Sequence, residues 1–273
     1  MNDSSRPTDS AIRKEQKENA KNEQGLSAPT VYEIISLEGI EEMRRPTKSL
    51  WWSGVVAGIA ISLSLYMMAA LRLGLEGSSA GILEKFGYSV GFLIVVLSRL
   101  QLFTENTVTP ILPALNNPSR SMLLKVLRLW AIVILANLCG TFCAAIIPLT
   151  LPMFTDAHVA AMLDISRHYA HRPMVEVFFS AIPAGFMVAI MVWMLKSSKG
   201  FEFWTITAIT FSIAVLDTSH VIVGSTELFM VLFNGDTNIM AALSRLLLTA
   251  TGNIIGGTVL FAGLAYAQVS EEL

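Results

Sequence analysis

Two apolar stretches of the chain carry polar and ionisable side chains that membrane-embedded segments seldom hold. In chain order these residues are Gln101, Thr104, Glu105, Asn106, Asp217, Ser219, His220 and Glu227. Ionisable groups are costly inside a bilayer and usually line a cavity or a proton relay. The two stretches are therefore candidate walls of a polar path across a membrane.

His220 has two interpretations. It could tie packed helices together through hydrogen bonds, or it could serve transport, and its depth in an apolar segment favours transport. An imidazole can gain or lose a proton near neutral pH, so a transport role would involve proton exchange. Asp217 lies three residues earlier, so on a helix it would share a face with His220 and could orient or pair with the imidazole. A merely structural Asp217 is the equal alternative.

Carboxylates stand beside both interruptions. Glu105 and Glu227 could accept backbone N–H bonds at the start of short helices, where the helix dipole favours negative charge. We favour this capping role, and a role in selectivity is the alternative. An ionised carboxylate that faces the path would repel a monovalent anion. It would therefore point to a neutral or cationic solute.

Apolar runs position these residues. The 273 residues are 53% hydrophobic and only 15% charged, and the net charge of −2 gives no reason to expect a nucleic-acid partner. A bilayer core needs about 20 apolar residues per helix. Six runs qualify: residues 50–71, a second from about Gly87 past Pro113, and then 122–151, 173–195, 203–233 and 237–268. The sequence predicts an all-α integral membrane protein with six transmembrane helices, of which the second and fifth are broken near Thr104 and His220.

The rest of the chain divides around these spans. We expect a disordered cytoplasmic tail over residues 1–30, an amphipathic interfacial helix over 31–49, the six-span domain over 50–268 and a short cytoplasmic C-terminus over 269–273. Basic residues flank the first, second and fourth spans on one side, which the positive-inside rule assigns to the cytoplasm. On the other side, a flexible loop with Arg167, His168, His171 and Arg172 is expected to form a solvated vestibule rather than a metal site.

The two halves of the chain show ordered similarity. Ala57-Gly58 matches Ala184-Gly185, residues 101–103 match 227–229, and the Asn137 to Gly140 segment matches the Asn253 to Gly256 segment. Since each half holds three spans, the second half must enter the membrane upside down, which predicts an inverted three-plus-three repeat. We expect Asn137 and Asn253 to serve packing and to satisfy backbone groups.

These features together resemble the formate/nitrite transporter family. The motifs are Leu102-Phe103-Thr104 with Asn106, His220 at the second break, and TGNIIGGTVLFAGLAY in the sixth span, and the resemblance covers about residues 30–268. It implies aquaporin-like protomers that form a homopentamer in a bacterial inner membrane, with no cofactor, no metal and no enzyme activity. It also implies that Thr104 and His220 meet halfway through the pore. Leu102 and Phe103 would form one constriction, and further constriction candidates are Tyr88, Phe92 and Ile213.

Three positions depart from the family pattern. Gly185 stands where an asparagine is usual, Tyr169 where a lysine is usual, and Ser219 where a glutamate commonly precedes the histidine. The resemblance implies a channel for small monovalent anions such as formate or nitrite, with proton coupling at the histidine. One alternative keeps the fold with a neutral or cationic solute. The other is a membrane enzyme or a non-conducting scaffold, although no paired catalytic residues support an enzyme.

Overall fold

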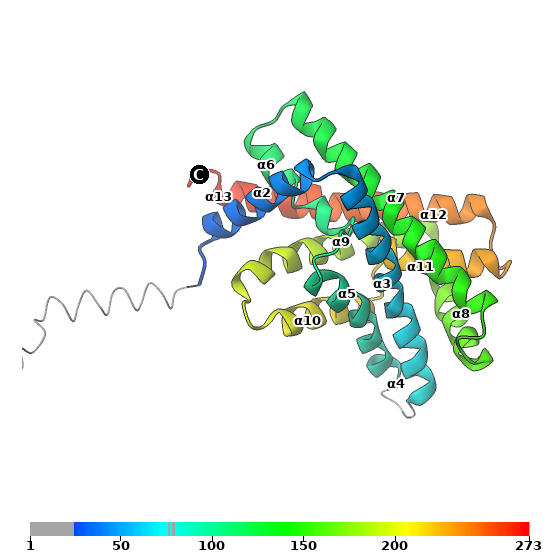
Figure 1. Cartoon of the computed structure of the whole chain (residues 1–273). Helices are drawn as coiled ribbons and strands as arrows, with labels where there is room; N and C mark the ends of the chain where they lie inside the picture. Colours follow the sequence, from blue (N-terminus) through cyan, green and yellow to red (C-terminus); the bar gives the residue numbers. More distant parts are fainter. Residues whose placement is uncertain (1–24, 76, 78–79, 273) are drawn as a thin grey trace, which may run out of the picture.

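The computed structural model describes residues 25–75, 77 and 80–272, and their regular secondary structure is helical (Figure 1). The elements are α2 (Ala28–Arg44), α3 (Thr47–Gly74), α4 (Ala80–Leu83), η1 (Glu84–Gly87), α5 (Tyr88–Leu97), η2 (Glu105–Thr107), α6 (Ile111–Asn116), α7 (Arg120–Thr150), α8 (Asp156–His171), α9 (Met174–Ser197), α10 (Glu202–Val215), α11 (Val221–Phe233), α12 (Ile239–Ile254), the π-helix η3 (Ile255–Ala262) and α13 (Gly263–Val269). Most of the predicted N-terminal tail, residues 1–24, lies outside the described residues.

The predicted pattern of whole and broken spans is confirmed. Among the described residues, five helical runs are long and apolar enough to cross a membrane: α3, α4 to α5, α7, α9 and α12 to α13. The second span starts at Ala80, earlier than predicted, and its first helical part ends at Leu97 before the irregular segment around Thr104. The fifth span consists of α10 and α11, with a break over residues 216–220.

The first helical parts of both broken spans end in the same left-handed cap. Arg99 and Asp217 have φ angles of 53° and 51°. After α5, Leu100 N–H donates to Val95 O at 3.0 Å, and after α10, Thr218 N–H donates to Ile213 O at 3.1 Å. This is the Schellman pattern, in which a left-handed residue redirects the chain and satisfies the last carbonyls. Two non-glycine residues adopt this uncommon conformation at equivalent positions.

Two buried asparagines hold the breaks. Asn137 of α7 accepts a hydrogen bond from Phe103 N–H at 2.9 Å, and its amide donates to carbonyls of the first break and of α3. Asn253 of α12 accepts from Val221 N–H at 2.9 Å, and its amide donates to carbonyls of the second break and of α9. A broken helix frees backbone groups that lipid cannot solvate. The predicted backbone-satisfying role of both asparagines is confirmed.

Close glycine contacts repeat in the two halves. A Cβ atom on Gly58 would lie 2.2 Å from Asn137 O, and one on Gly185 would lie 2.2 Å from Asn253 O. The inverted repeat therefore holds for α3 with α7 and for α9 with α12. One predicted match is wrong: since the asparagines bind the N–H groups of Phe103 and Val221, residues 101–103 correspond to 219–221, and Glu227 lies further along α11.

Two connecting segments differ from expectation. Helix α2 ends at Arg44, because Pro46 starts a new helix, α3, where residues 31–49 were predicted to form one interfacial helix. The predicted flexible loop with the vestibule histidines is instead the 16-residue helix α8. Thr155 caps α8 by accepting from His158 N–H at 3.4 Å, and a buried face that includes Met162 packs on α11 and α3.

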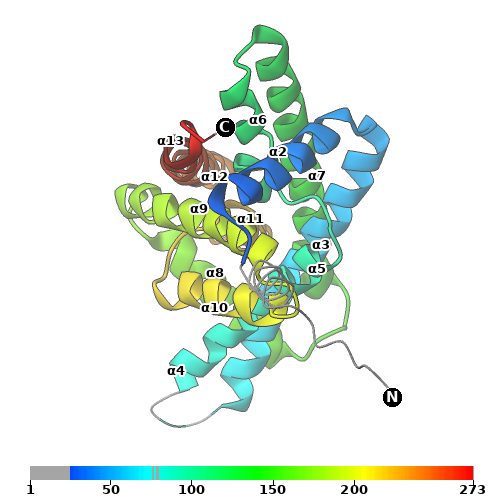
Figure 2. The ribbon, with the colours of Figure 1, turned by 90° about the vertical axis from the view of Figure 1, so that its left-hand side faces the viewer.

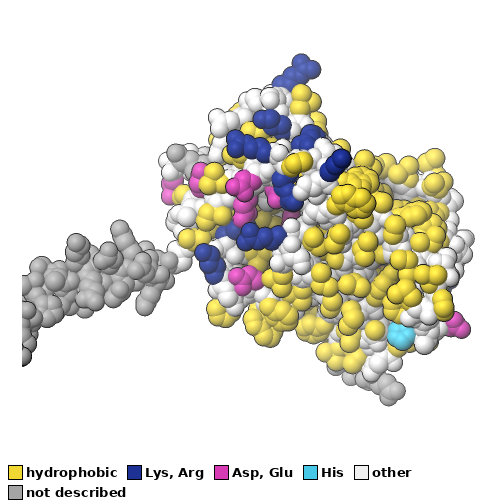
Figure 3. All heavy atoms as spheres, in the orientation of Figure 1, with side chains coloured by type: hydrophobic (Ala, Val, Ile, Leu, Met, Phe, Trp, Pro, Cys, Tyr) yellow, Lys and Arg dark blue, Asp and Glu magenta, His cyan; other side chains and the backbone are white. Residues whose placement is uncertain are grey.

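The basic segments that flank the spans gather at one end. Arg128 of α7 donates to the carbonyl oxygens of Met43 and Arg45 at 3.3 and 3.2 Å, and Lys196 of α9 lies 2.5 Å from Glu38 of α2. Figure 2 looks onto this end, where α2 lies beside α6 and α13. Figure 3 shows Lys and Arg side chains concentrated at this end, while the rest of the face seen in that figure is mainly hydrophobic. The three basic segments therefore share one side of the membrane protein.

Candidate solute path

The two breaks meet at Thr104 and His220. The Thr104 hydroxyl oxygen lies 2.7 Å from His220 Nε2, and both side chains are buried. Thr104 directly precedes η2 and His220 directly precedes α11, so each is placed by the break in its own span. The structure thus brings together the two residues that the family resemblance placed at mid-pore.

His220 also caps α11, a role that its residue type did not signal. Its Nδ1 accepts a hydrogen bond from Val223 N–H at 3.3 Å. Because Nδ1 uses its lone pair, the ring proton is on Nε2 and donates to Thr104. The Thr104 hydroxyl accepts this bond and keeps its own proton to donate. The contact pattern assigns a neutral imidazole and leaves one hydroxyl donor at the junction of the breaks.

The constriction candidates lie in three different surroundings. The Phe92 ring packs edge-on against the imidazole of His220, with centroids 5.0 Å apart, and Tyr88 lies 5.4 Å from Phe92. Phe103 instead packs against Trp130 of α7, with centroids 6.0 Å apart. Leu102 and Ile213 are fully buried in the core. Phe92 is therefore the aromatic side chain in contact with the central histidine.

A cavity of about 60 Å³ leads from the α8 side of the molecule to His220. We call it the α8 cavity. Its polar lining consists of Lys85, Tyr88, His168, Tyr169, Arg172, Asp217, Thr218, Ser219, His220 and Glu227. The predicted vestibule cluster thus splits: His168 and Arg172 line the cavity, whereas Arg167 pairs with Asp236 at 2.8 Å. His171 is not among the lining residues.

Of the two interpretations of Asp217, the structure does not support contact with His220. Helix α10 ends at Val215, so Asp217 lies in the left-handed turn and shares no helical face with His220. Its carboxylate binds His168 Nε2 at 3.0 Å and Arg172 Nη1 at 3.4 Å. Arg172 also donates to the Asp217 carbonyl at 2.6 Å. Asp217 therefore joins the break to the end of α8.

The capping role predicted for the two glutamates is also wrong. Glu227 is the seventh residue of α11, and the cap position belongs to His220. Glu105 starts η2, but its side chain makes no capping bond. Within the described part of the chain, Glu105 Oε1 is buried without a hydrogen-bond partner. Glu227 lies in the wall of the α8 cavity, which reasoning from capping could not place.

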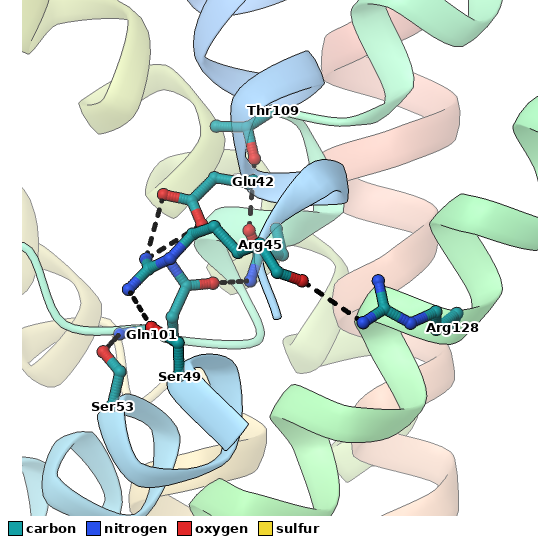
Figure 4. A network of polar contacts seen from close by, with 8 residues as sticks. Glu42, Arg45, Ser49, Ser53, Gln101, Thr109 and Arg128 are labelled. Atoms are coloured by element: carbon teal, nitrogen blue, oxygen red, sulfur yellow. Dashed lines mark hydrogen bonds and ion pairs between the residues drawn. The ribbon is translucent and has the colours of Figure 1, made fainter. Parts of the chain in front are cut away.

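The first break is tied to α2 by a polar network (Figure 4). Gln101 donates to the Glu42 carboxylate at 2.7 Å, and Asn106 donates to Gln101 Oε1 at 3.1 Å. Thr109 continues the chain by donating to Asn106 Oδ1 at 3.3 Å, and Arg45 pairs with Glu42 at 3.0 Å. The side chain of Asn106, predicted as a pore residue, therefore serves this network.

Two of the residues that depart from the family pattern, Gly185 and Tyr169, are fixed by their packing. Gly185 leaves no room for an asparagine, because α12 backbone occupies the space of a side chain. The hydroxyl oxygens of Tyr169 and Thr249 are hydrogen-bonded at 2.6 Å, and the Tyr169 ring packs against Gly224, so Tyr169 is held in the cavity wall.

Lys85, which sequence reasoning missed, lines the same cavity from η1 and brings an ammonium group to it. A lone lysine at the start of a span was its only signal.

Comparisons with known proteins agree with this arrangement. The profile of the family described as formate/nitrite transporter matches residues 29–267. The chain is 36% identical over 248 residues to inner membrane protein YfdC of Escherichia coli (strain K12), covering 90% of this chain and 80% of that protein. It is 29% identical over 167 residues to formate channel FocA of Haemophilus influenzae, covering 57% of this chain and 56% of that protein.

Two solved structures share the fold. An FNT family ion channel has a TM-score of 0.75 at 18% identity, covering 87% of this chain and 98% of its own. A pentameric formate channel with formate bound has a TM-score of 0.69 at 19% identity, covering 82% and 98%. A profile match across most of the chain, combined with two broken spans that meet at a threonine and a histidine, shows that this chain belongs to the formate/nitrite transporter family.

Proposed function

We propose that this protein conducts small monovalent anions of weak acids, formate and nitrite among them, through a path in each protomer that passes Thr104 and His220. The observation that carries the proposal is the 2.7 Å contact between these residues, which come from opposite halves of the repeat. Formate channels among the relatives support the solute class. The protein acts as a homopentamer in the bacterial inner membrane, with both termini in the cytoplasm.

The geometry suggests how an anion would be received. His220 Nε2–H and the Thr104 hydroxyl form a donor pair, and the N-terminus of α11 adds positive partial charge beside them. Phe92 makes the surroundings of the imidazole apolar. An unneutralised anion would be strongly destabilised there. Transport of the anion together with a proton, as a neutral acid, removes most of this cost.

Flux into proteoliposomes tests the proposal. We expect formate, nitrite and acetate to be carried, with faster flux at acidic pH, and a neutral solute of similar size to be carried poorly. The second candidate function, passage of a neutral or cationic solute, is favoured by the Glu227 carboxylate in the cavity wall. It predicts the reverse order of rates. A reconstituted pentamer that carries no test solute would support a non-conducting scaffold.

A further inference from the structure

One face of α11 forms a wall of the α8 cavity. His220, Val223, Gly224 and Glu227 all line the cavity, and their spacing places them in one stripe along the helix. At about 1.5 Å per residue, Glu227 lies about 10 Å from His220 along the helix axis. A solute that moves through the cavity toward the central histidine must therefore pass the carboxyl group of Glu227.

The charges of the cavity leave Glu227 unpaired. Asp217 is bound by His168 and Arg172. The Glu84 carboxylate is held by Arg72 at 2.8 and 2.9 Å, and Lys85 lies further from it, at 3.8 Å. Among the described residues, Glu227 forms no ion pair within 4.0 Å. One free carboxyl group and one weakly paired ammonium group thus face the same small cavity.

The surroundings of Glu227 hold few other ionisable groups. α11 packs against α3, α7, α8 and α12. The ionisable groups that share its cavity are Lys85, Tyr88, His168, Tyr169, Arg172 and Asp217, together with His220 on the same stripe. From α12, Arg245 lies 5.8 Å from the ring centroid of Tyr169. Of the two carboxyl groups in this set, Asp217 is paired with His168 and Arg172, whereas Glu227 has no ionic partner among the described residues.

His220 is poorly suited to supply a proton to the solute. Its Nδ1 accepts from Val223 N–H, so a proton added at Nδ1 would face another N–H group and abolish the cap of α11. The positive end of the same helix also disfavours an imidazolium ion. A proton that accompanies the anion past the apolar region must therefore come from another group.

We propose that Glu227 is this proton-exchanging group, an inference that rests on the proposed function. A small carboxylate or other weak-acid anion enters the α8 cavity, attracted by Lys85 and Arg172, and takes the proton of the Glu227 carboxylic acid. The O–H bond of Glu227 breaks and an O–H bond forms on the solute, which leaves a Glu227 carboxylate and a neutral acid. The carboxylate takes its next proton from the water that reaches the cavity. Neutral acid then passes Thr104 and His220.

Proteoliposome flux of two anions from about pH 5 to 8 tests this inference. Formate can take a proton, whereas nitrate, the anion of a strong acid, cannot. In the Glu227→Gln variant we expect formate flux at acidic pH to fall by about a hundredfold, the low end of what a positioned proton-transfer group contributes. Nitrate, which cannot cross as a neutral acid, should be carried slowly by wild type and variant alike, so its flux should change little. Glu227→Asp should restore part of the acid stimulation, and Asp164→Asn, which removes an exposed carboxylate of α8, should behave as wild type.

The outcomes separate the possible roles of Glu227. Formate flux that keeps its magnitude and acid stimulation in a Glu227→Gln pentamer overturns the inference alone. Faster flux of both anions would identify Glu227 as a fixed electrostatic barrier and would also overturn it. Loss of pentamer yield in Glu227→Gln, unrelieved in Glu227→Asp, would assign a structural role instead. A wild-type protein that carries neither anion overturns the proposed function and the inference with it.

Discussion

Asn137 and Asn253 make the same three hydrogen bonds in opposite halves of the molecule. Each accepts from a backbone N–H group at a break and donates to one carbonyl of that break and one of the neighbouring span. Such a residue must be an amide, because it needs an acceptor and two donors in one planar group. The two asparagines therefore fix the positions from which Thr104 and His220 project.

Replacing either asparagine by alanine should destabilise the protein. Asn137→Ala and Asn253→Ala each leave two buried backbone groups of a break unpaired, one N–H and one C=O, at about 1–3 kcal/mol per group. We expect similar, large decreases in the melting temperature of detergent-solubilised protein for both variants. Asn117→Ala, at an exposed position, serves as the control. Unequal effects of the two core variants would contradict the equivalence of the breaks.

A second prediction concerns Gly185, which stands where the family usually has an asparagine. Gly185→Asn should abolish correct packing, because even its Cβ would lie 2.2 Å from Asn253 O and overpacking of this kind costs about 1–3 kcal/mol or more. Gly263→Ala is the matched control in the same type of helix, since a Cβ there meets no atom within 4 Å. It should raise stability by up to about 1 kcal/mol. Thermal melting and pentamer yield measure both. A stable Gly185→Asn pentamer would show that α9 and α12 can separate.

Much of the fold follows from the sequence. The spacing of apolar runs and the polar interruptions locate the spans and both breaks, because lipid imposes a fixed length and excludes polar residues from ordinary helices. The match of residues 101–103 to 227–229 failed because both segments contain a Leu-Phe pair, whereas the true equivalence lies in backbone geometry. Arg99 and Asp217 share a left-handed φ but no chemical likeness. No sequence comparison could align them.

The site was only partly predictable for a similar reason. The breaks at Thr104 and His220 were located because ionisable or polar groups at membrane depth are rare, whereas the meeting of these two residues was implied by the family resemblance. The partners of Asp217 and Glu227 depend on where α10 ends and on how α8 folds over the break, and both are tertiary features. Lys85 reaches the cavity from a short 3₁₀ helix, η1, which no periodic pattern marks.

A third prediction uses the ion pair outside the membrane spans. The hydrogen bond from Arg167 lowers the pKa of Asp236, in the turn after α11. A lowered folded-state pKa stabilises the protein above the unfolded value of about 3.9, and this stabilisation is lost as pH falls through the folded value. Arg167→Gln should therefore melt at a lower temperature than wild type at pH 7, and the difference should disappear at a pH well below 4.

Because both side chains are partly exposed, salt should weaken this effect. Melting curves at low and high ionic strength provide the control. Arg167 also pairs with Asp164, at 3.3 Å. The Asp164→Asn variant therefore serves as a second control, which separates the contribution of this pair from that of the pair with Asp236. A difference in melting temperature that is independent of pH would show that Arg167 acts through packing of its side chain rather than through its charge.

A fourth prediction concerns His220 itself. His220→Phe removes both the cap of α11 and the donor to Thr104, while the ring can still pack against Phe92. We expect weak-acid flux to be lost, with the pentamer retained but melting lower by the equivalent of about 1–2 kcal/mol, the usual cost of a lost cap. His220→Asn keeps a capping acceptor and should recover stability without recovering flux. Wild-type flux and pH profile in the His220→Phe pentamer would refute the role of the imidazole in transport.

The last prediction concerns Thr107, whose hydroxyl group binds the backbone of Thr104. Its hydroxyl donates to the carbonyl oxygen of Thr104 at 2.7 Å, and Thr258 of the π-helix η3 donates to the Thr107 carbonyl at 2.6 Å. Gly257 of η3 leaves room for the Thr107 side chain, since a Cβ there would lie 2.2 Å from its hydroxyl. π-helical segments recur at functional sites. Here the segment holds the first break against the sixth span.

Thr107→Val keeps the shape of the side chain but removes the donor, and Thr107→Ser keeps the donor. If the hydroxyl positions Thr104, the valine variant should lose at least about tenfold in formate flux, because small displacements of a contact group have large kinetic effects. Its pentamer yield should stay near that of wild type, and its melting temperature should fall by the equivalent of about 1 kcal/mol. The serine variant should restore flux. Parallel loss of flux and pentamer in both variants would mean that Thr107 only fills space beside Gly257, and the positioning role would have to be abandoned.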